Sequence, residues 1–239
     1  MTFTMSNICI IPARSGSKRI PLKNIKLFLG RPIISYSIEA AISSKLFDVV
    51  MVSTEDKDIA IIAKKYGATV PFYRSAENSN DNATTFDVIN EVINHYKELN
   101  LNFTHICCLY PCAPFVNNRI LSESFDIFKK TNYDSIIPIV PFSYPIQRAI
   151  KVNKDKTISF LNPIYKNSKS QDLKIKYHDS GQFYWLNKNA LIKKEILTDN
   201  TGFFELNPMY THDIDTIEDW EMAEFKFKLL LENKKKVND

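Results

Sequence analysis

The stretch NICIIPARSGSKRIPLKN, residues 7–24, begins with a short apolar run and ends in a strongly basic loop. The run Asn7–Pro12 has the length and composition of a buried β-strand. The loop after it contains one glycine and four cationic side chains, Arg14, Lys18, Arg19 and Lys23. Ligands of open α/β sheets bind beyond the carboxyl ends of the strands, so cations at this place indicate a polyphosphate site. The alternative is an ordinary solvent-exposed loop.

Apolar runs alternate with helical patterns along most of the chain. Strands are predicted at 7–12, 48–54, 104–110, 134–140 and 181–187, and helices at 32–44, 59–66, 83–99, 117–131 and from 215 onwards. This order predicts an α/β protein with a mostly parallel sheet and helices on both of its faces. The 239 residues are predicted to form a single domain, residues 1–239.

The regular alternation of strands and helices breaks after Val140. Residues 141–163 alternate like a β-hairpin whose turn is Asn153–Thr157, and a polar stretch follows. We therefore expect residues 141–180 to form an insertion that leaves the sheet and returns to it through the strand 181–187. Such an insertion is expected to cover the site or to contact a second subunit.

The composition limits the class of protein. The net charge of +4 is too small to indicate a nucleic-acid-binding protein, and Lys234–Lys236 are expected in a solvated helix end. The four cysteines form no CxxC pair, and Cys9, Cys107 and Cys108 lie in apolar runs, which indicates reduced thiols. No run approaches the ~20 apolar residues of a membrane span, and the first residues lack the apolar region of a signal peptide. We expect a soluble cytoplasmic protein.

Asp213 and Asp215 are separated by one residue in HDIDTIEDW, near the end of the chain. In an extended segment, residues i and i+2 point to the same side, and two such carboxylates suit Mg²⁺ that shares its other ligands with phosphate. The alternative is structural, because Asp215 and Glu218 have the spacing of a capping box for the last helix. The two roles of Asp215 are compatible. His212 is expected to be a packed or solvent-facing neighbour.

Two further segments carry candidate residues. The loop RSAENSNDNATT offers Arg74, Asp81 and the hydroxyl of Thr85 for base recognition, with an ordinary polar loop as the alternative. Phe203 and Phe204 are adjacent, so in an extended segment one would face the core and the other a cleft, with core packing as the alternative. The chain lacks the G-x-S-x-G, HExxH and Walker motifs, which predicts metal-assisted phosphate chemistry without a covalent nucleophile.

The segments IPARSGSKRIPLKN and HDIDTIEDW together resemble the cytidylyltransferases that activate sialic-acid-like sugars. FDVVMVSTEDKDIAIIAKKYGA and RSAEN…ATT match that family in the same order and spacing, and the resemblance extends from Asn7 to the last helix. It implies a three-layer α/β/α, Rossmann-like nucleotidyltransferase fold. It also implies Mg²⁺-dependent use of CTP and a homodimer.

The resemblance implies roles for individual positions. Arg14 and Lys23 correspond to triphosphate-binding residues, and Asp213 and Asp215 correspond to the metal-binding carboxylates; these four form the implied catalytic set. Together with their neighbours Ser15 and Asp81, the predicted nucleotide-binding residues are Ala13, Arg14, Ser15, Lys23, Asn24, Arg74, Asp81, Ala83 and Thr85. Lys18 and Arg19 are expected to steer the nucleotide or to close over it.

The departures from the sialic acid synthetases concern the half that binds the sugar. Tyr110 stands in place of a glutamine and Val116 in place of an arginine. Gln147 replaces a lysine, and His178 replaces an arginine. SYPIQRAIKV and KSQDL…YHDSGQFYW instead resemble the pseudaminic acid cytidylyltransferase subfamily. The predicted sugar-binding residues are Tyr110, Gln147, Arg148, His178, Gln182, Tyr184, and Phe203 and Phe204, which correspond to an apolar wall for the sugar's acyl group.

The resemblance implies synthesis of CMP-pseudaminic acid and pyrophosphate from CTP and pseudaminic acid, with the anomeric hydroxyl attacking the α-phosphorus. No general base is assigned, and the candidates are a metal-bound hydroxide, Asp213 acting through water, and His178. Three alternatives stay open. They are synthesis of CMP-sialic or CMP-legionaminic acid, an Asp-x-Asp glycosyltransferase that consumes a sugar nucleotide, and a non-catalytic nucleotide-binding protein.

Overall fold

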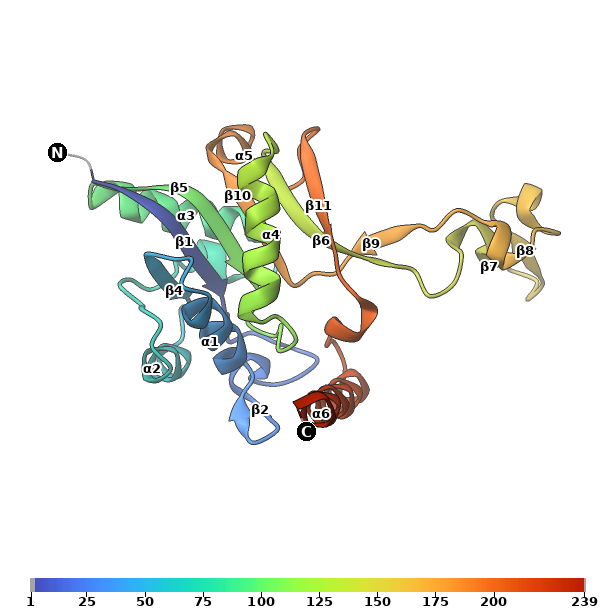
Figure 1. Cartoon of the computed structure of the whole chain (residues 1–239), viewed down its shortest axis with the longest axis horizontal. Coiled ribbons are helices and arrows are strands. Elements are labelled where there is room, and N and C mark those ends of the chain that lie inside the picture. Colours follow the sequence, from blue (N-terminus) through green and yellow to red (C-terminus); the bar gives the residue numbers. More distant parts are fainter. Residues whose placement is uncertain (1–2, 239) are drawn as a thin grey trace.

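A seven-stranded sheet forms the centre of the protein (Figure 1). The computed structural model describes residues 3–238, and it describes side chains from residue 7 to residue 233. The strands are β1 (Phe3–Pro12), β4 (Val49–Ser53), β5 (Leu101–Leu109), β6 (Ser135–Pro141), β9 (Tyr177–Asp179), β10 (Phe183–Asn187) and β11 (Thr201–Glu205). Their order is β11-β6-β10-β5-β1-β4, and β9 pairs with β6.

The sheet is mixed, with three parallel and three antiparallel pairings between strands, although five of its seven strands run in the same direction. β1 is parallel to β4 and β5, and β11 is parallel to β6. β10 runs antiparallel between β5 and β6 and so joins the two parallel parts of the sheet. The predicted returning strand at 181–187 is therefore confirmed, and it returns in the opposite direction to its neighbours. The α/β fold class is confirmed with this mixed sheet.

Helices cover both faces of the sheet (Figure 1). The helices are α1 (Ile34–Ser44), α2 (Lys57–Lys65), α3 (Thr85–Glu98), α4 (Asn118–Lys130), α5 (Lys188–Lys193) and α6 (Ile217–Asn238). Residues of α1, α2 and α4 share one apolar cluster with the sheet, and residues of α3 and α5 share another. Pro32 lies in the short strand β3 (Arg31–Pro32), so the prediction that it opens α1 is wrong. No described helix is long and apolar enough to cross a membrane.

The last helix packs at the edge of this layered core. In a third apolar cluster, Trp220 and Ala223 of α6 join Phe28 of the short strand β2 (Leu27–Phe28). Ile214, which precedes the helix, is 2% exposed in the same cluster. This packing brings the C-terminal segment beside the basic loop, nearly 200 residues earlier. The side chains of Lys234–Lys236, predicted as a solvated helix end, lie outside the described residues.

Residues between β6 and β9 project from the sheet as a long arm (Figure 1). The arm contains the antiparallel pair β7 (Ile150–Val152) and β8 (Ile158–Phe160), so the predicted hairpin and its turn are confirmed. Its apolar side chains remain largely exposed, with Val152 75% and Ile164 84% accessible. The division of the chain into one domain, 1–239, with an insertion at 141–180, stays a prediction.

The capping box of α6 is formed by Thr216 and Asp219. The hydroxyl oxygen of Thr216 accepts a hydrogen bond from the Asp219 backbone N–H, and Asp219 Oδ2 accepts one from the Thr216 backbone N–H at 2.8 Å. The prediction that Asp215 and Glu218 cap this helix is therefore wrong. Because the cap lies one residue later, the carboxylate of Asp215 remains available for other contacts.

We expect Thr216→Ala to lower the free energy of unfolding by about 1 kcal/mol, the usual cost of a lost N-cap. Glu221→Ala, at an exposed position in the next turn of the same helix, is the matched control and should change stability by less than about 0.5 kcal/mol. Urea unfolding followed by circular dichroism measures both values. Equal losses in the two variants would contradict the assignment of the cap.

Candidate active site

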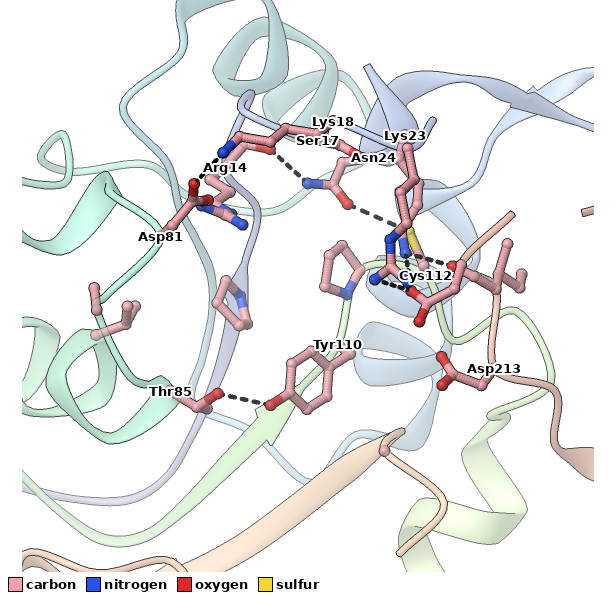
Figure 2. Close-up of a pocket in the computed structure, with 18 of the residues that line it drawn as sticks. Arg14, Ser17, Lys18, Lys23, Asn24, Asp81, Thr85, Tyr110, Cys112 and Asp213 are labelled. Carbon is pink, nitrogen blue, oxygen red and sulfur yellow. Dashed lines mark hydrogen bonds and ion pairs between the residues drawn. The ribbon is translucent and has the colours of Figure 1, made fainter. Parts of the chain in front are cut away.

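A cavity of about 650 Å³ opens at the carboxyl ends of β1 and β5 (Figure 2). Five segments surround it: the basic loop after β1, the loop before α3, the segment after β5, the β9–β10 loop, and the segment before α6. Its volume lies in the range of small-molecule sites. The cavity therefore unites segments that the sequence places far apart, including the basic loop and the Asp213–Asp215 pair.

The basic loop is held by its own polar contacts. The side-chain amide of Asn24 donates to the backbone carbonyl of Arg14 at 2.8 Å, which ties the start of the loop to its end. The backbone N–H and hydroxyl of Ser15 both donate to Glu55, at 2.7 and 2.8 Å. Ala13 is fully buried in the core. Arg14, Lys23 and Asn24 thus line the cavity, whereas Ala13 and Ser15 do not and instead hold the loop in place.

Two carboxylates pair with the four cations of the loop. Asp81 lies 2.6 Å from both Arg14 and Lys18, and Asp215 lies 2.8 Å from Arg19 and 3.6 Å from Lys23. Hydrogen bonds from Lys18 and Arg14 hold the pKa of Asp81 below its ordinary value. Its ion pairs are therefore present at neutral pH and are lost only as the pH falls through that lowered pKa. All four cations and both carboxylates line the cavity.

Asp213 and Asp215 both face the cavity, as the i, i+2 spacing predicts. Ile214 between them is buried in the core, so its two neighbours point the other way. Figure 2 shows the carboxylate of Asp213 directed into the cavity. No hydrogen bond or ion pair joins this carboxylate to another described residue. Asp215 forms ion pairs with Arg19 and Lys23. The ammonium group of Lys23 also donates to the backbone carbonyl of Ile214.

The two aspartates form a donor set that fits Mg²⁺. Within residues 3–238, no group of three or more His, Cys, Asp or Glu side chains could hold a metal ion. Mg²⁺ commonly binds through one or two carboxylates and takes its remaining ligands from water and substrate phosphates. Asp213 and Asp215, next to the four cations of the basic loop, match that pattern.

The loop before α3 forms another wall of the cavity. Arg74 is 7% exposed and donates from Nε to the hydroxyl of Ser53 at 3.0 Å and to the Ser53 carbonyl. Burial lowers the pKa of Arg74. Ala83 and Thr85 also line the cavity, so every predicted residue of this loop reaches it. The remaining N–H donors of Arg74 suit a hydrogen-bond acceptor such as the carbonyl of a nucleobase.

Tyr110 lies on the floor of the cavity between this loop and the β9–β10 loop. Its hydroxyl is 2.7 Å from that of Thr85 (Figure 2). Its ring meets the ring of Tyr184 edge to face, with 5.7 Å between centroids. Burial raises the pKa of Tyr110 to about 12, so the phenol stays neutral near neutral pH. Of the predicted sugar-binding residues, Tyr110 and Gln182 line the cavity.

The other predicted sugar-binding residues lie elsewhere in the protomer. Tyr184 is buried behind the floor and donates to Asp179 at 2.6 Å. Phe204 packs against the core and Phe203 is 60% exposed on the edge strand β11, so the predicted opposite orientation of the two is confirmed. Three residues lie on the arm or at its base and outside the cavity of the same chain: Gln147, Arg148 and His178.

Sequence reasoning missed several residues of the cavity. Cys112 lines it, and its thiol donates to Asn24 at 3.3 Å, which helps to orient that amide. Ser180 and His212 line it with side-chain atoms that have no hydrogen-bond partner within the described chain. Cys112 and Ser180 lie in the segments LYPCAPFV and YHDSGQFYW, whose differences from the sialic acid synthetases were the available signal.

Comparison with known proteins gives one consistent result. The family model of cytidylyltransferases matches residues 8–237. The chain is 41% identical over 226 residues to the pseudaminic acid cytidylyltransferase of Campylobacter jejuni, covering 94% of this chain and 97% of that protein. It is 30% identical to the CMP-N,N'-diacetyllegionaminic acid synthase of Legionella pneumophila over 92% and 95% of the two chains.

A solved structure of CMP:2-keto-3-deoxy-manno-octonic acid synthetase complexed with CTP shares the fold. Its TM-score is 0.69 at 18% identity, over 94% of this chain and 99% of that one. The family match defines the class of the protein as a nucleotidyltransferase, and the shared fold agrees with it. With the family match across nearly the whole chain, the protein belongs to the cytidylyltransferase family and is an enzyme of that class.

We expect Asp81→Asn to tighten the binding of inorganic triphosphate by about two- to tenfold, because it removes an internal anion from two exposed cations. Asp126→Asn, an exposed carboxylate on α4, controls for the change in net charge. Calorimetry at constant ionic strength compares the two variants with the unmodified protein. Unchanged or weaker triphosphate binding in Asp81→Asn would contradict this competition. If Asp81 also contacts the nucleoside, CTP binding weakens in the same variant while triphosphate binding tightens.

Proposed function

We propose that this protein transfers the CMP part of CTP to the anomeric hydroxyl of pseudaminic acid, giving CMP-pseudaminic acid and pyrophosphate. The observation that carries the proposal is the cavity itself, which joins four cations and the Asp213–Asp215 pair at the carboxyl end of β1. The choice of acid rests on the similarity to the Campylobacter jejuni protein, the most similar of the relatives compared above.

The reaction needs positioning and charge stabilisation more than covalent help. The anomeric oxygen forms a bond to the α-phosphorus, the α–β phosphoanhydride bond breaks, and pyrophosphate leaves with that electron pair. Arg14 and Lys23 stabilise the charge that builds on the departing pyrophosphate. Before they do so, their contacts with Asp81 and Asp215 are replaced by contacts with phosphate. The hydroxyl proton is lost to water.

Asp213 and Asp215 are the residues that would hold Mg²⁺. When bound, this ion supplies positive charge and polarisation at the α-phosphate. Because Arg19 and Lys23 contact Asp215, the same carboxylate would couple the position of the metal to that of the basic loop. Asn24 keeps the two ends of this loop together through the Arg14 carbonyl. The chain's own residues therefore align the triphosphate before the chemical step.

We further propose that the arm is the interface of a homodimer. The arm exposes many large apolar side chains close together, and exposed apolar patches of this kind mark interaction sites. They are Tyr144, Ile146, Ile150, Val152, Ile158, Leu161, Ile164 and Ile175. Pairing with the same arm of a second copy would cover them and could carry Gln147, Arg148 and His178 to the other copy's cavity. Gln147 Oε1 and Arg148 Nε are buried without a partner in the described part of this chain, which supports a missing contact there.

The glycosyltransferase alternative is less consistent with the charge of the cavity. An enzyme that consumes a CMP-sugar faces one phosphate, whereas four cations suit the larger charge of a triphosphate. Incubation with CTP and acid, against incubation with a CMP-sugar and an acceptor alcohol, separates the two functions. Pyrophosphate release in the first mixture supports the synthetase.

We expect Asp213→Ala to lose at least ~10²-fold in turnover, the scale of one lost transition-state contact. Asp126→Ala, on the exposed side of α4, is the control and should keep its activity. Pyrophosphate release with CTP, pseudaminic acid and Mg²⁺ measures both. Because no described hydrogen bond uses this carboxylate, the variant should unfold at the same urea concentration as the unmodified protein. Turnover near that of the unmodified enzyme would overturn the metal assignment.

We expect two inactive variants, Asp213→Ala and Arg148→Ala, to regain activity when they are co-refolded in equal amounts. If the arm acts on the partner's cavity, the mixture reaches about a quarter of normal turnover, because half of the dimers are mixed and each has one intact site. If the arm acts only within its own protomer, the mixture stays inactive. Refolding each variant alone is the control.

A further inference from the structure

The β9–β10 loop, residues 179–182 with the last residue of β9 included, forms one wall of the cavity through residues 180–182. The backbone N–H of Ser180 donates to Pro138 at 3.0 Å, and the Gln182 carbonyl accepts from Tyr110 N–H at 2.9 Å. Gly181 between them has φ +63°, a conformation that favours glycine. The loop is thus tied to β6 on one side and to the end of β5 on the other.

Asp179 holds this loop from within. Its Oδ1 accepts from the Gly181 backbone N–H at 2.8 Å, and its Oδ2 accepts from the Tyr184 hydroxyl at 2.6 Å. Burial and the nearby Tyr110 raise the pKa of Tyr184, so its hydroxyl remains a donor. Because both carboxylate oxygens are engaged, Asp179 acts as a positioning residue for its neighbours.

Two side chains of the loop have polar atoms that lack partners. Gln182 is 3% exposed and Ser180 is 7% exposed, and both line the cavity. Gln182 Oε1 and the Ser180 hydroxyl oxygen make no hydrogen bond within the described chain. Buried polar groups are almost always paired, since leaving one unpaired is costly. Oxygens without partners at two nearby positions of one cavity wall could accept hydrogen bonds from a ligand.

The orientation of the Gln182 amide follows from its surroundings. Its Nε2 donates to the backbone carbonyl of Tyr210 at 3.1 Å, so the oxygen is the atom left without a partner. A carbonyl oxygen only accepts hydrogen bonds, and none of residues 179–182 is cationic. This wall therefore suits an N–H or O–H donor and does not suit a carboxylate or a phosphate.

The rest of the cavity is already matched to other chemistry. The basic loop and Asp213–Asp215 suit the triphosphate with its metal, and the loop with Arg74 suits the nucleobase. The remaining wall is the one that the acid acceptor would meet. We propose that Gln182 and Ser180 determine acceptor specificity by binding one hydrogen-bond-donating substituent, a hydroxyl or an acylamino N–H, of the acid. This inference rests on the proposed function.

Gln182→Met tests the inference because methionine has a similar shape but no amide oxygen. Its KM for the acid should rise about tenfold or more, while its KM for CTP stays within about twofold. Ser180→Ala should change KM in the same direction. The control is Ser124→Ala, since this buried serine of α4 accepts from Trp185 Nε1 at 3.0 Å; it should lower stability without changing either KM.

A second measurement identifies the donor and does not depend on the variants alone. Acid analogues that lack one hydroxyl, or that carry a methyl on one acylamino nitrogen, are compared with the parent acid. With the unmodified enzyme, one analogue should show a KM about tenfold higher, and Gln182→Met should no longer distinguish it from the parent. If the donor is a hydroxyl, the analogue that lacks this hydroxyl is the sensitive one. If the donor is an acylamino N–H, the N-methyl analogue is the sensitive one.

The outcomes separate this inference from the proposed function. If the unmodified enzyme releases no pyrophosphate with CTP and any nonulosonic acid, the proposed function is wrong. The enzyme could instead turn over normally while every analogue has the KM of the parent acid, or while Gln182→Met leaves the KM for the acid unchanged. Either result would show that Ser180 and Gln182 do not determine acceptor specificity. An equal rise of both KM values would assign Gln182 to the nucleotide and would also overturn the inference.

Discussion

The contact between the basic loop and the segment 213–215 is the constraint on which the site depends. Arg19 and Lys23 meet Asp215, and Lys23 also binds the Ile214 carbonyl, across 191 residues of sequence. Apolar packing makes this contact precise, because Ile20 and Ile214 are buried in the same cluster. Packing of the apolar core, and not attraction between the charges, therefore places the neighbouring charged residues at the cavity.

The strength of these ion pairs suits their exchange for phosphate. The side chains of Lys18 and Arg19 are 81% and 66% exposed, and exposed pairs contribute little to stability. Asp81 and Asp215 thus limit repulsion among four cations, and in the proposed function they compete only weakly with the triphosphate. Lys23, at 22% exposure, is held more firmly and keeps the loop in register with the aspartates.

The antiparallel strand β10 has a second organising role. Its insertion between β5 and β6 places the 179–182 loop beside Tyr110 and closes the cavity opposite the basic loop. The same return of the chain leaves the preceding arm projecting from the sheet. The antiparallel return of the chain is therefore linked both to this wall of the cavity and to the surface proposed for dimerisation.

The sequence predicted the regular elements well because each depends on local patterns. The buried strands and amphipathic helices follow hydrophobic period, and the opposite orientation of Phe203 and Phe204 follows from strand alternation. The helix cap was misplaced because Asp215–Glu218 and Thr216–Asp219 have the same spacing, and only the backbone geometry selects one. Ala13 and Ser15 stay predicted nucleotide-binding residues, but neither lines the cavity, because Ala13 is buried in the core and Ser15 donates to Glu55.

By itself, the sequence determined the fold class, the phosphate-type chemistry and the family, since these depend on residue types in a fixed order. The tertiary structure decided which of those residues share a cavity, because that depends on packing between segments up to 191 residues apart. It also decided that Ser180 and Gln182 line the cavity and that each has a side-chain oxygen without a hydrogen-bond partner in the described chain. No sequence pattern reports an unsatisfied hydrogen bond, since it arises only when every neighbouring group has found its partner.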